Sequence, residues 1–185
     1  MILLPHDGQS LGLSGFGASA HLGIKTVKHL CPHTKVFVFA RAAEERSFAD
    51  SLGADWCGAT DDEPPEPLDA IIDTTPAWTP ILKALEVLKP GGRLVINAIR
   101  KEPQDQSCLQ ELDYARHLWM EKEVKSVANI TRKDVEAFLH LAGRIPIQPE
   151  VTYYQLEEGK LALQDMKHGG TRGARVLRVS QDANS

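Results

Sequence analysis

The sequence is poor in cysteine and offers no obvious set of metal ligands. Its three cysteines lie at positions 31, 57 and 108, and no two of them form a Cys-x-x-Cys pair. This odd, widely spaced set excludes a disulfide framework and a thiolate-rich zinc site. Cys31 and His33 are separated by one residue, which is a poor spacing for two ligands of one metal ion.

The chain also lacks an excess of basic charge and any long apolar run. It carries 21 Lys and Arg against 25 Asp and Glu, a formal net charge of −4, which argues against nucleic acid as a partner. No apolar run approaches the roughly 18 residues that cross a bilayer, so no membrane partner is expected. The start, Met1 to Pro5, has no basic region typical of a signal peptide, so a cytoplasmic location is expected.

What the sequence does have is a regular alternation of short apolar runs and helix-period stretches. The apolar fraction is 42% and the charged fraction 25%, as in an ordinary globular domain. Such alternation predicts an α/β fold with a doubly wound parallel sheet and helices on both faces. The expected strands cover residues 11–14, 36–39, 55–57, 68–73, 94–96 and 124–128. The expected helices cover residues 18–30, 44–52, 78–88, 109–122 and a stretch from the N-cap Thr131 to Leu141, and the glycine pair 91–92 is expected to end the third of them.

The last forty residues follow a different pattern and suggest a domain boundary. An extended segment over 146–156, a short helix over 157–167 and a strand over 175–179 are expected there. The last strand alternates with period two, so one of its faces needs a cover. The sequence therefore predicts one domain over residues 1–145 and a C-terminal unit over residues 146–185.

A glycine-rich turn joins the first expected strand to the first helix. Its sequence is G-x-G-x-x-A, in which the first glycine permits a tight turn and the second lets a pyrophosphate approach the backbone. The small third residue allows the helix to pack closely on the strand, and free N–H groups at the helix start attract an anion. A turn without a ligand is the alternative. The candidate residues are Gly15, Gly17, Ala18, Ser19 and Ala20.

The end of the second strand suggests which dinucleotide is bound. An acid there would bind the ribose 2′-hydroxyl of NAD, but the sequence has Ala40 and Arg41. A guanidinium suits a 2′-phosphate, which favours NADP and leaves NAD possible. A solvated Arg41 without a ligand is the alternative reading.

The carboxyl ends of the later strands supply the remaining candidates for the cofactor crevice. The fourth strand ends in the short polar run Asp73-Thr74-Thr75-Pro76, of which Thr75 and Pro76 are the candidates, and the fifth strand is followed by Asn97, Ala98 and Ile99.

At this level of detail the chain resembles the cofactor domain of the medium-chain, zinc-dependent alcohol dehydrogenases. The resemblance is carried by the segments 11–22, 49–56, 68–73, 84–95, 124–134 and 145–179. It implies a Rossmann sheet of order 3-2-1-4-5-6 and hydride transfer between a nicotinamide and an alcohol or aldehyde. Gly15, Gly17 and Ala20 match the phosphate turn, and Ala40 stands where NAD-binding members carry an acid. Thr75 and residues 97–99 match positions that line the ribose and nicotinamide.

The same resemblance implies an N-terminal catalytic domain that this chain lacks. That domain supplies the zinc ligands, so no catalytic or metal-binding residue is assigned here and zinc is expected only in the missing domain. Residues 146–185 would be the remnant that normally packs on it, and the portion present would be inactive alone. The sixth strand, 124–128, is the expected contact of a homodimer.

Two other functions remain open on the sequence alone. One is a non-catalytic dinucleotide-binding or interaction protein. The other is an S-adenosylmethionine-dependent methyltransferase, because the stretch L-K-P-G-G-R-L-V over 88–95 resembles a signature common in that class. Against it, methyltransferases of that kind carry acids where this chain has Leu13-Ser14 and Ala40-Arg41.

Overall fold

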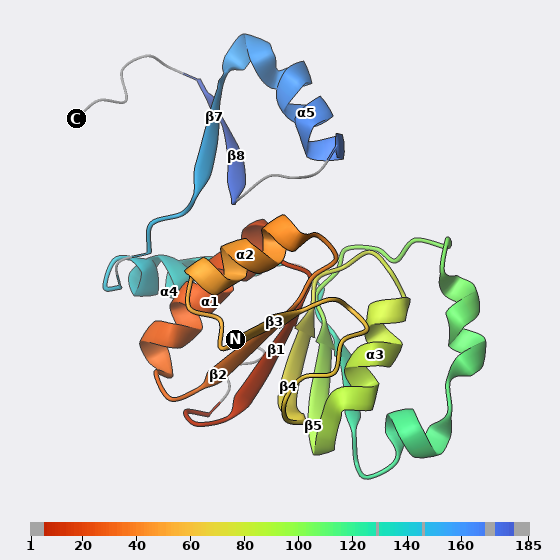
Figure 1. Cartoon of the computed structure of the whole chain (residues 1–185). Helices are drawn as coiled ribbons and strands as arrows, with labels where there is room; N and C mark the ends of the chain where they lie inside the picture. The colour runs from red at the N-terminus through yellow and green to blue at the C-terminus, as the bar shows by residue number, and fades with distance from the viewer. Residues whose placement is uncertain (1–5, 129, 146, 169–172, 180–185) are drawn as a thin grey trace.

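The structure, a computed structural model, describes residues 6–128, 130–145, 147–168 and 173–179. Met1 to Pro5, which bear on the signal-peptide expectation, lie outside these residues. The larger part of the chain forms a six-stranded parallel sheet of order β3-β2-β1-β4-β5-β6, which confirms the predicted α/β fold and strand order (Figure 1). Its elements are β1 (Ser10–Ser14), α1 (Ala18–Leu30), β2 (Lys35–Phe39), α2 (Ala43–Ser51), β3 (Trp56–Gly58), β4 (Leu68–Asp73), α3 (Thr79–Val87), β5 (Leu88–Ile96), β6 (Glu123–Ser126) and α4 (Arg132–Ala142). No helix among the described residues has the length and apolar character to cross a bilayer.

Two apolar clusters hold helices to opposite faces of this sheet. Alternate residues of β2 divide between them, with Val36 and Val38 in one cluster and Phe37 and Phe39 in the other. The first cluster joins the sheet to α1 and α2, and the second joins it to α3 (Figure 1). A strand buried on both faces reads as an unbroken apolar run, which is why residues 36–39 were predicted as one.

The third helix ends earlier than the sequence suggested. The prediction ran the helix to Leu88 and ended it at the glycine pair 91–92, but α3 stops at Val87 and β5 begins at Leu88. Leu88 is extended and pairs with Leu68 of β4, and the register shifts before Ala70 pairs with Arg93. Lys89 precedes Pro90, and a residue before proline is driven out of the helical region. The glycines therefore lie in an irregular strand instead of a helix cap.

The continuous helix predicted over 109–122 was wrong. That region contains a 3-10 helix, η1 (Gln106–Glu111), and a short π-helix, η2 (Tyr114–Leu118). Between them, the Asp113 side chain accepts the Arg116 N–H, and the His117 ring accepts the Asp113 N–H at 2.9 Å. These side-chain bonds compete with the backbone bonds of a regular helix.

The C-terminal part forms a small unit of its own architecture. It contains β7 (Val151–Gln155), η3 (Leu156–Glu158), α5 (Gly159–His168) and β8 (Ala174–Arg178), and β7 and β8 pair in a two-stranded parallel sheet. Figure 1 shows this unit set apart from the main sheet and reached through α4. A domain boundary at residue 145 stays a prediction.

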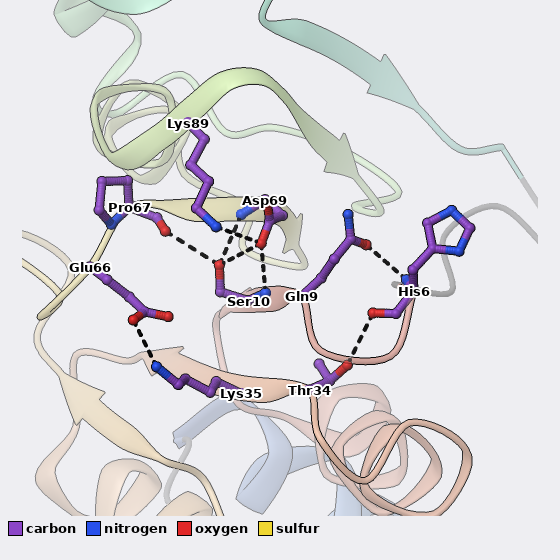
Figure 2. A network of polar contacts seen from close by, with 9 residues as sticks. All are labelled: His6, Gln9, Ser10, Thr34, Lys35, Glu66, Pro67, Asp69 and Lys89. Atoms are coloured by element: carbon purple, nitrogen blue, oxygen red, sulfur yellow. Dashed lines mark hydrogen bonds and ion pairs between the residues drawn. The ribbon is translucent and has the colours of Figure 1, made fainter.

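A polar network closes the amino-terminal edge of the main sheet. Ser10 of β1 donates from its backbone N–H and its hydroxyl to Asp69 of β4, both at 2.8 Å, and Lys89 of β5 reaches the same carboxylate at 2.8 Å. Figure 2 shows Asp69 between Ser10 and Lys89, with the Lys35–Glu66 pair beside them. The network joins β1, β4 and β5 near the amino-terminal ends of these strands, away from their carboxyl ends.

Candidate functional site

The first glycine of the turn allows a close approach between two loops. Gly15 has φ +82°, and its N–H donates to Phe39 O at 2.8 Å. A Cβ at this position would lie 2.9 Å from Thr74 Oγ1 and 3.0 Å from Thr75 Cγ2. Only glycine meets both the positive φ and the contact with the loop that follows β4.

The second glycine faces open space at the start of α1. Gly17 is the N-cap residue of α1, and no side chain caps this helix among the described residues. A Cβ on Gly17 would meet nothing within 4 Å. The start of α1 is therefore open in front of Gly17, as the N-terminus of a helix that receives a phosphate has to be.

A cavity of about 520 Å3 lies beside this turn, at the carboxyl ends of β1, β2 and β4. Six of the predicted site residues line it: Gly15, Gly17, Ala40, Arg41, Thr75 and Pro76. The other lining residues are Phe16, Phe39, Glu45, Thr60, Thr74, Ala77, Pro80, Glu102, Gln104 and Asp105. Its volume is within the range of ligand pockets.

The other six predicted residues do not line this cavity. Ala18 and Ser19 are exposed in the first turn of α1, while Ala20 is buried against the sheet. Asn97 follows β5 and donates its N–H to Asp73 O, Ala98 follows it, and the Ile99 side chain is fully exposed. Their contact with a cofactor stays a prediction.

The turn after β2 is fixed by an arginine that the sequence analysis missed. Arg46 Nη1 of α2 donates to Ala40 O at 2.7 Å and to Arg41 O at 2.8 Å. These bonds hold the backbone of the two residues that the sequence linked to cofactor choice. Arg41 is exposed, and Glu45 lines the same cavity with the opposite charge.

An ion pair and hydrogen bonds connect the loop after β4 with the loop after β5, on the side of the cavity away from Arg41. Lys101 Nζ lies 2.5 Å from Asp73 Oδ2, and the Asp73 side chain is completely buried. Asp105 accepts the N–H groups of Trp78 and Thr79 at 2.8 and 2.7 Å and so caps α3. Burial raises the pKa of Asp105, but the hydrogen bonds from Thr79 and Trp78 outweigh it and hold the pKa below the usual range.

A second cavity of about 400 Å3 lies between α3 and the acidic, proline-rich segment 60–67. It shares Phe39, Thr60 and Pro80 with the first cavity. The two cavities therefore adjoin at the end of β2.

A metal centre is not formed by the residues that the structure describes. Within them, no group of three or more His, Cys, Asp or Glu side chains is arranged to hold an ion. Burial raises the pKa of the Cys57 thiol to about 11, which disfavours the thiolate that a metal needs. The zinc implied by the family resemblance therefore finds no ligand set here.

Comparison with known proteins identifies the relatives of the chain. It is 36% identical over 176 residues to "Probable alcohol dehydrogenase AdhA" of Mycobacterium tuberculosis, a match over 95% of this chain and 49% of that protein. Its structure resembles cinnamyl alcohol dehydrogenase SbCAD4 of Sorghum bicolor, with a TM-score of 0.80 and 25% identity over 93% of this chain and 48% of that one. Its homologues are alcohol dehydrogenases of the medium-chain superfamily. No family model matches the chain.

These relatives confirm the family resemblance predicted from the sequence. The fold also resembles the Helicobacter pylori CAD that is complexed with NADP(H), with a TM-score of 0.74 and 20% identity over 93% of this chain and 48% of that one. The chain spans about half the length of the curated relatives that it matches.

Proposed function

We propose that the chain is the dinucleotide-binding portion of an alcohol dehydrogenase-like oxidoreductase, which transfers a hydride between a nicotinamide and an alcohol or aldehyde. The observation that carries this proposal is the open space in front of Gly17, at an uncapped helix start that borders the 520 Å3 cavity. A diphosphate placed there would meet backbone N–H groups and the positive end of α1.

The strand order gives a bound dinucleotide its direction. Because β1 lies between β2 and β4, its glycine turn stands between the turn that carries Arg41 and the loop that carries Thr75. The adenosine half would therefore lie toward Arg41, and the nicotinamide half toward Thr75 and the loop after β5.

The proposed cofactor is NADP(H), with NAD(H) as the weaker ligand. Arg41 offers an exposed guanidinium at the edge of the cavity, where a 2′-phosphate would lie. Glu45 opposes this preference, since a carboxylate in the same cavity repels a phosphate. Structural neighbours bind either form, since the Helicobacter pylori CAD is complexed with NADP(H) and the acetophenone reductase of Geotrichum candidum with NAD, so the choice depends on Arg41.

The chemistry assigned to this chain is limited to binding and orienting the cofactor. In alcohol dehydrogenases that use zinc, the metal polarises the alcohol oxygen. The described residues offer no zinc ligand set, so we place the metal and the substrate pocket in a part of the enzyme that this chain does not contain.

The C-terminal unit and β6 are the proposed contact surfaces. The unit leaves an apolar group exposed, which would pack on the missing domain: Tyr153, Leu156, Leu161, Leu163, Met166, Val176, Leu177 and Val179. β6 lies at the edge of the main sheet and would pair with a second copy. The cytoplasmic location expected from the sequence stays a prediction.

A ligand titration tests the binding proposal directly. The chain is titrated with NADPH, NADH and S-adenosylmethionine, and the melting temperature and the nicotinamide fluorescence are followed. NADPH is expected to raise the melting temperature most, because a ligand that binds only the folded state stabilises it. Stabilisation by S-adenosylmethionine alone would identify a methyltransferase, and no shift with either nicotinamide cofactor would overturn the proposal.

A further inference from the structure

A buried ion pair lies directly below the cavity, at the carboxyl end of β4. Asp73 is the last residue of β4 and its side chain is fully buried, while Lys101 lies beyond β5 and its side chain is 9% exposed. A buried pair is costly to desolvate, and it persists where further hydrogen bonds satisfy both groups. These bonds are present here.

All three protons of the Lys101 ammonium have acceptors. Besides Asp73 Oδ2, Lys101 Nζ lies 2.8 Å from Thr75 O and 2.8 Å from Ala77 O. The second oxygen of Asp73 accepts the Thr75 hydroxyl at 2.8 Å. The pair therefore holds the loop 74–77 by its backbone carbonyls and by one side chain.

The held loop forms the wall of the cavity that faces the glycine turn. Thr74 donates its N–H to Ser14 O at 2.9 Å, and Thr74 and Thr75 leave no room for a Cβ on Gly15. Thr75, Pro76 and Ala77 all line the cavity. A change in the Asp73–Lys101 pair would therefore move the surface against which the nicotinamide ribose would lie.

We propose that Lys101 is a positioning residue of the cofactor site, which acts with Asp73 to fix the loop 74–77 against the glycine turn. The inference rests on the proposed dinucleotide binding. Lys101 lines no part of the cavity and touches no ligand on this account. Loss of Lys101 would weaken binding of the nicotinamide half of the dinucleotide, because Thr75 lies on the β4 side of the glycine turn. Arg41, which would contact the adenosine half, lies on the β2 side.

The test compares whole and partial ligands on the Lys101→Met variant. The dissociation constants of NADPH and of adenosine 2′,5′-bisphosphate, which has the adenosine half but no nicotinamide, are measured by calorimetry. Lys101→Met is expected to raise the dissociation constant of NADPH about tenfold or more and that of the bisphosphate by less than about twofold.

The chain provides a matched control for a purely structural effect. Lys89 of β5 forms an ion pair with Asp69 of β4, at the opposite end of β4 from Asp73 and the cavity. Lys89→Met is expected to lower the melting temperature and to leave both dissociation constants unchanged. If Lys101→Met does not fold, the Asp73→Asn/Lys101→Met double variant removes both charges and is expected to show the same loss of NADPH affinity.

The outcomes separate this inference from the proposed function. A parent chain that binds no nicotinamide cofactor overturns both. A parent chain that binds NADPH, with Lys101→Met binding it equally well or losing both ligands in equal proportion, overturns the positioning role alone.

Discussion

At the scale of single residues, the glycine turn was predictable because its chemistry is local. A tight turn and an open approach to the backbone are set by neighbours in sequence, so G-x-G-x-x-A between a strand and a helix predicts the geometry that Gly15 and Gly17 adopt. The sequence placed Asp73 at the end of its strand, but its ion pair with Lys101 was not predictable, since 28 residues separate them and the pairing of β4 with β5 brings them together.

Gly17 offers a substitution that separates binding from folding. Gly17→Val places its side chain where no protein atom lies within 4 Å, and the φ of −100° is ordinary for any residue. We expect an unchanged melting temperature and NADPH binding weakened about thirtyfold or more, because the side chain fills the phosphate site. Gly23→Val is the matched control, since that glycine also has free space around it but lies within α1, away from the cavity. Equal affinity in Gly17→Val would contradict the assigned phosphate site.

Arg41 and Glu45 allow the cofactor preference to be tested by charge. Arg41→Ala is expected to raise the dissociation constant of NADPH about tenfold and to change that of NADH by less than about twofold, because only NADPH carries the 2′-phosphate. Glu45→Gln is expected to tighten NADPH, since it removes a like charge from the same cavity. Fluorescence titration of both cofactors against each variant gives the ratios. A parent chain that prefers NADH, or an Arg41→Ala variant that loses both cofactors equally, would refute the role of Arg41.

At the scale of elements, the sequence predicted regular segments well and irregular ones poorly. α1 and β4 have the predicted bounds, because their apolar spacing and their flanking glycine or proline agree. The N-cap at Thr131 was also expected and is present, and the structure adds the reciprocal bond from Asp134 that completes a capping box. The helix predicted over 109–122 was wrong because the side chains of Asp113 and His117 bond to nearby backbone N–H groups. These bonds compete with those of a regular helix, despite the helical spacing of the apolar residues.

The network of Ser10, Asp69 and Lys89 gives the sheet a pH-dependent element. Burial raises the pKa of Asp69, but the hydrogen bonds from Lys89 and Ser10 outweigh it, and the pKa lies below its usual value. A carboxyl with a lowered folded pKa adds stability that is present above its unfolded pKa and is lost as the pH falls through the folded one.

Asp69→Asn is therefore expected to be destabilised by about 1–3 kcal/mol at neutral pH, because it weakens a shared acceptor. Its deficit against the parent chain should be constant above about pH 5 and should shrink below about pH 4. Urea unfolding at several pH values measures it. Glu66→Gln is the control, because the exposed Lys35–Glu66 pair is expected to contribute less than about 0.5 kcal/mol. A deficit for Asp69→Asn that stays constant down to pH 3 would show that the carboxylate charge is not what holds the three strands.

At the scale of the whole molecule, the surfaces left open decide how the chain associates. All four residues of β6 are exposed at the edge of the sheet, and Trp119 and Met120, just before it, are about half exposed. The sequence could predict this strand but not which of its backbone N–H groups are left for a second chain. Those groups are the ones that point away from β5, and the structure identifies them.

Backbone alternation along β6 identifies a substitution that blocks edge pairing without breaking the sheet. Val127 donates its N–H to Ile96 O of β5, so the N–H of Lys125 points toward β5 as well and the N–H of Val124 points outward. Val124→Pro removes only that outward donor, which an edge strand tolerates.

If β6 pairs with a second copy, light scattering during gel filtration should give twice the mass of one chain for the parent. Val124→Pro should then give the mass of a single chain, with unchanged circular dichroism. Val124→Thr keeps the donor and the β-branched shape and should remain a dimer. A parent chain that is monomeric throughout a dilution series, or a Val124→Pro variant that still dimerises, would place the contact elsewhere. Because the exposed apolar group of the C-terminal unit is the other candidate surface, Leu163→Asp in α5 distinguishes the two, and it should leave a β6-paired dimer intact.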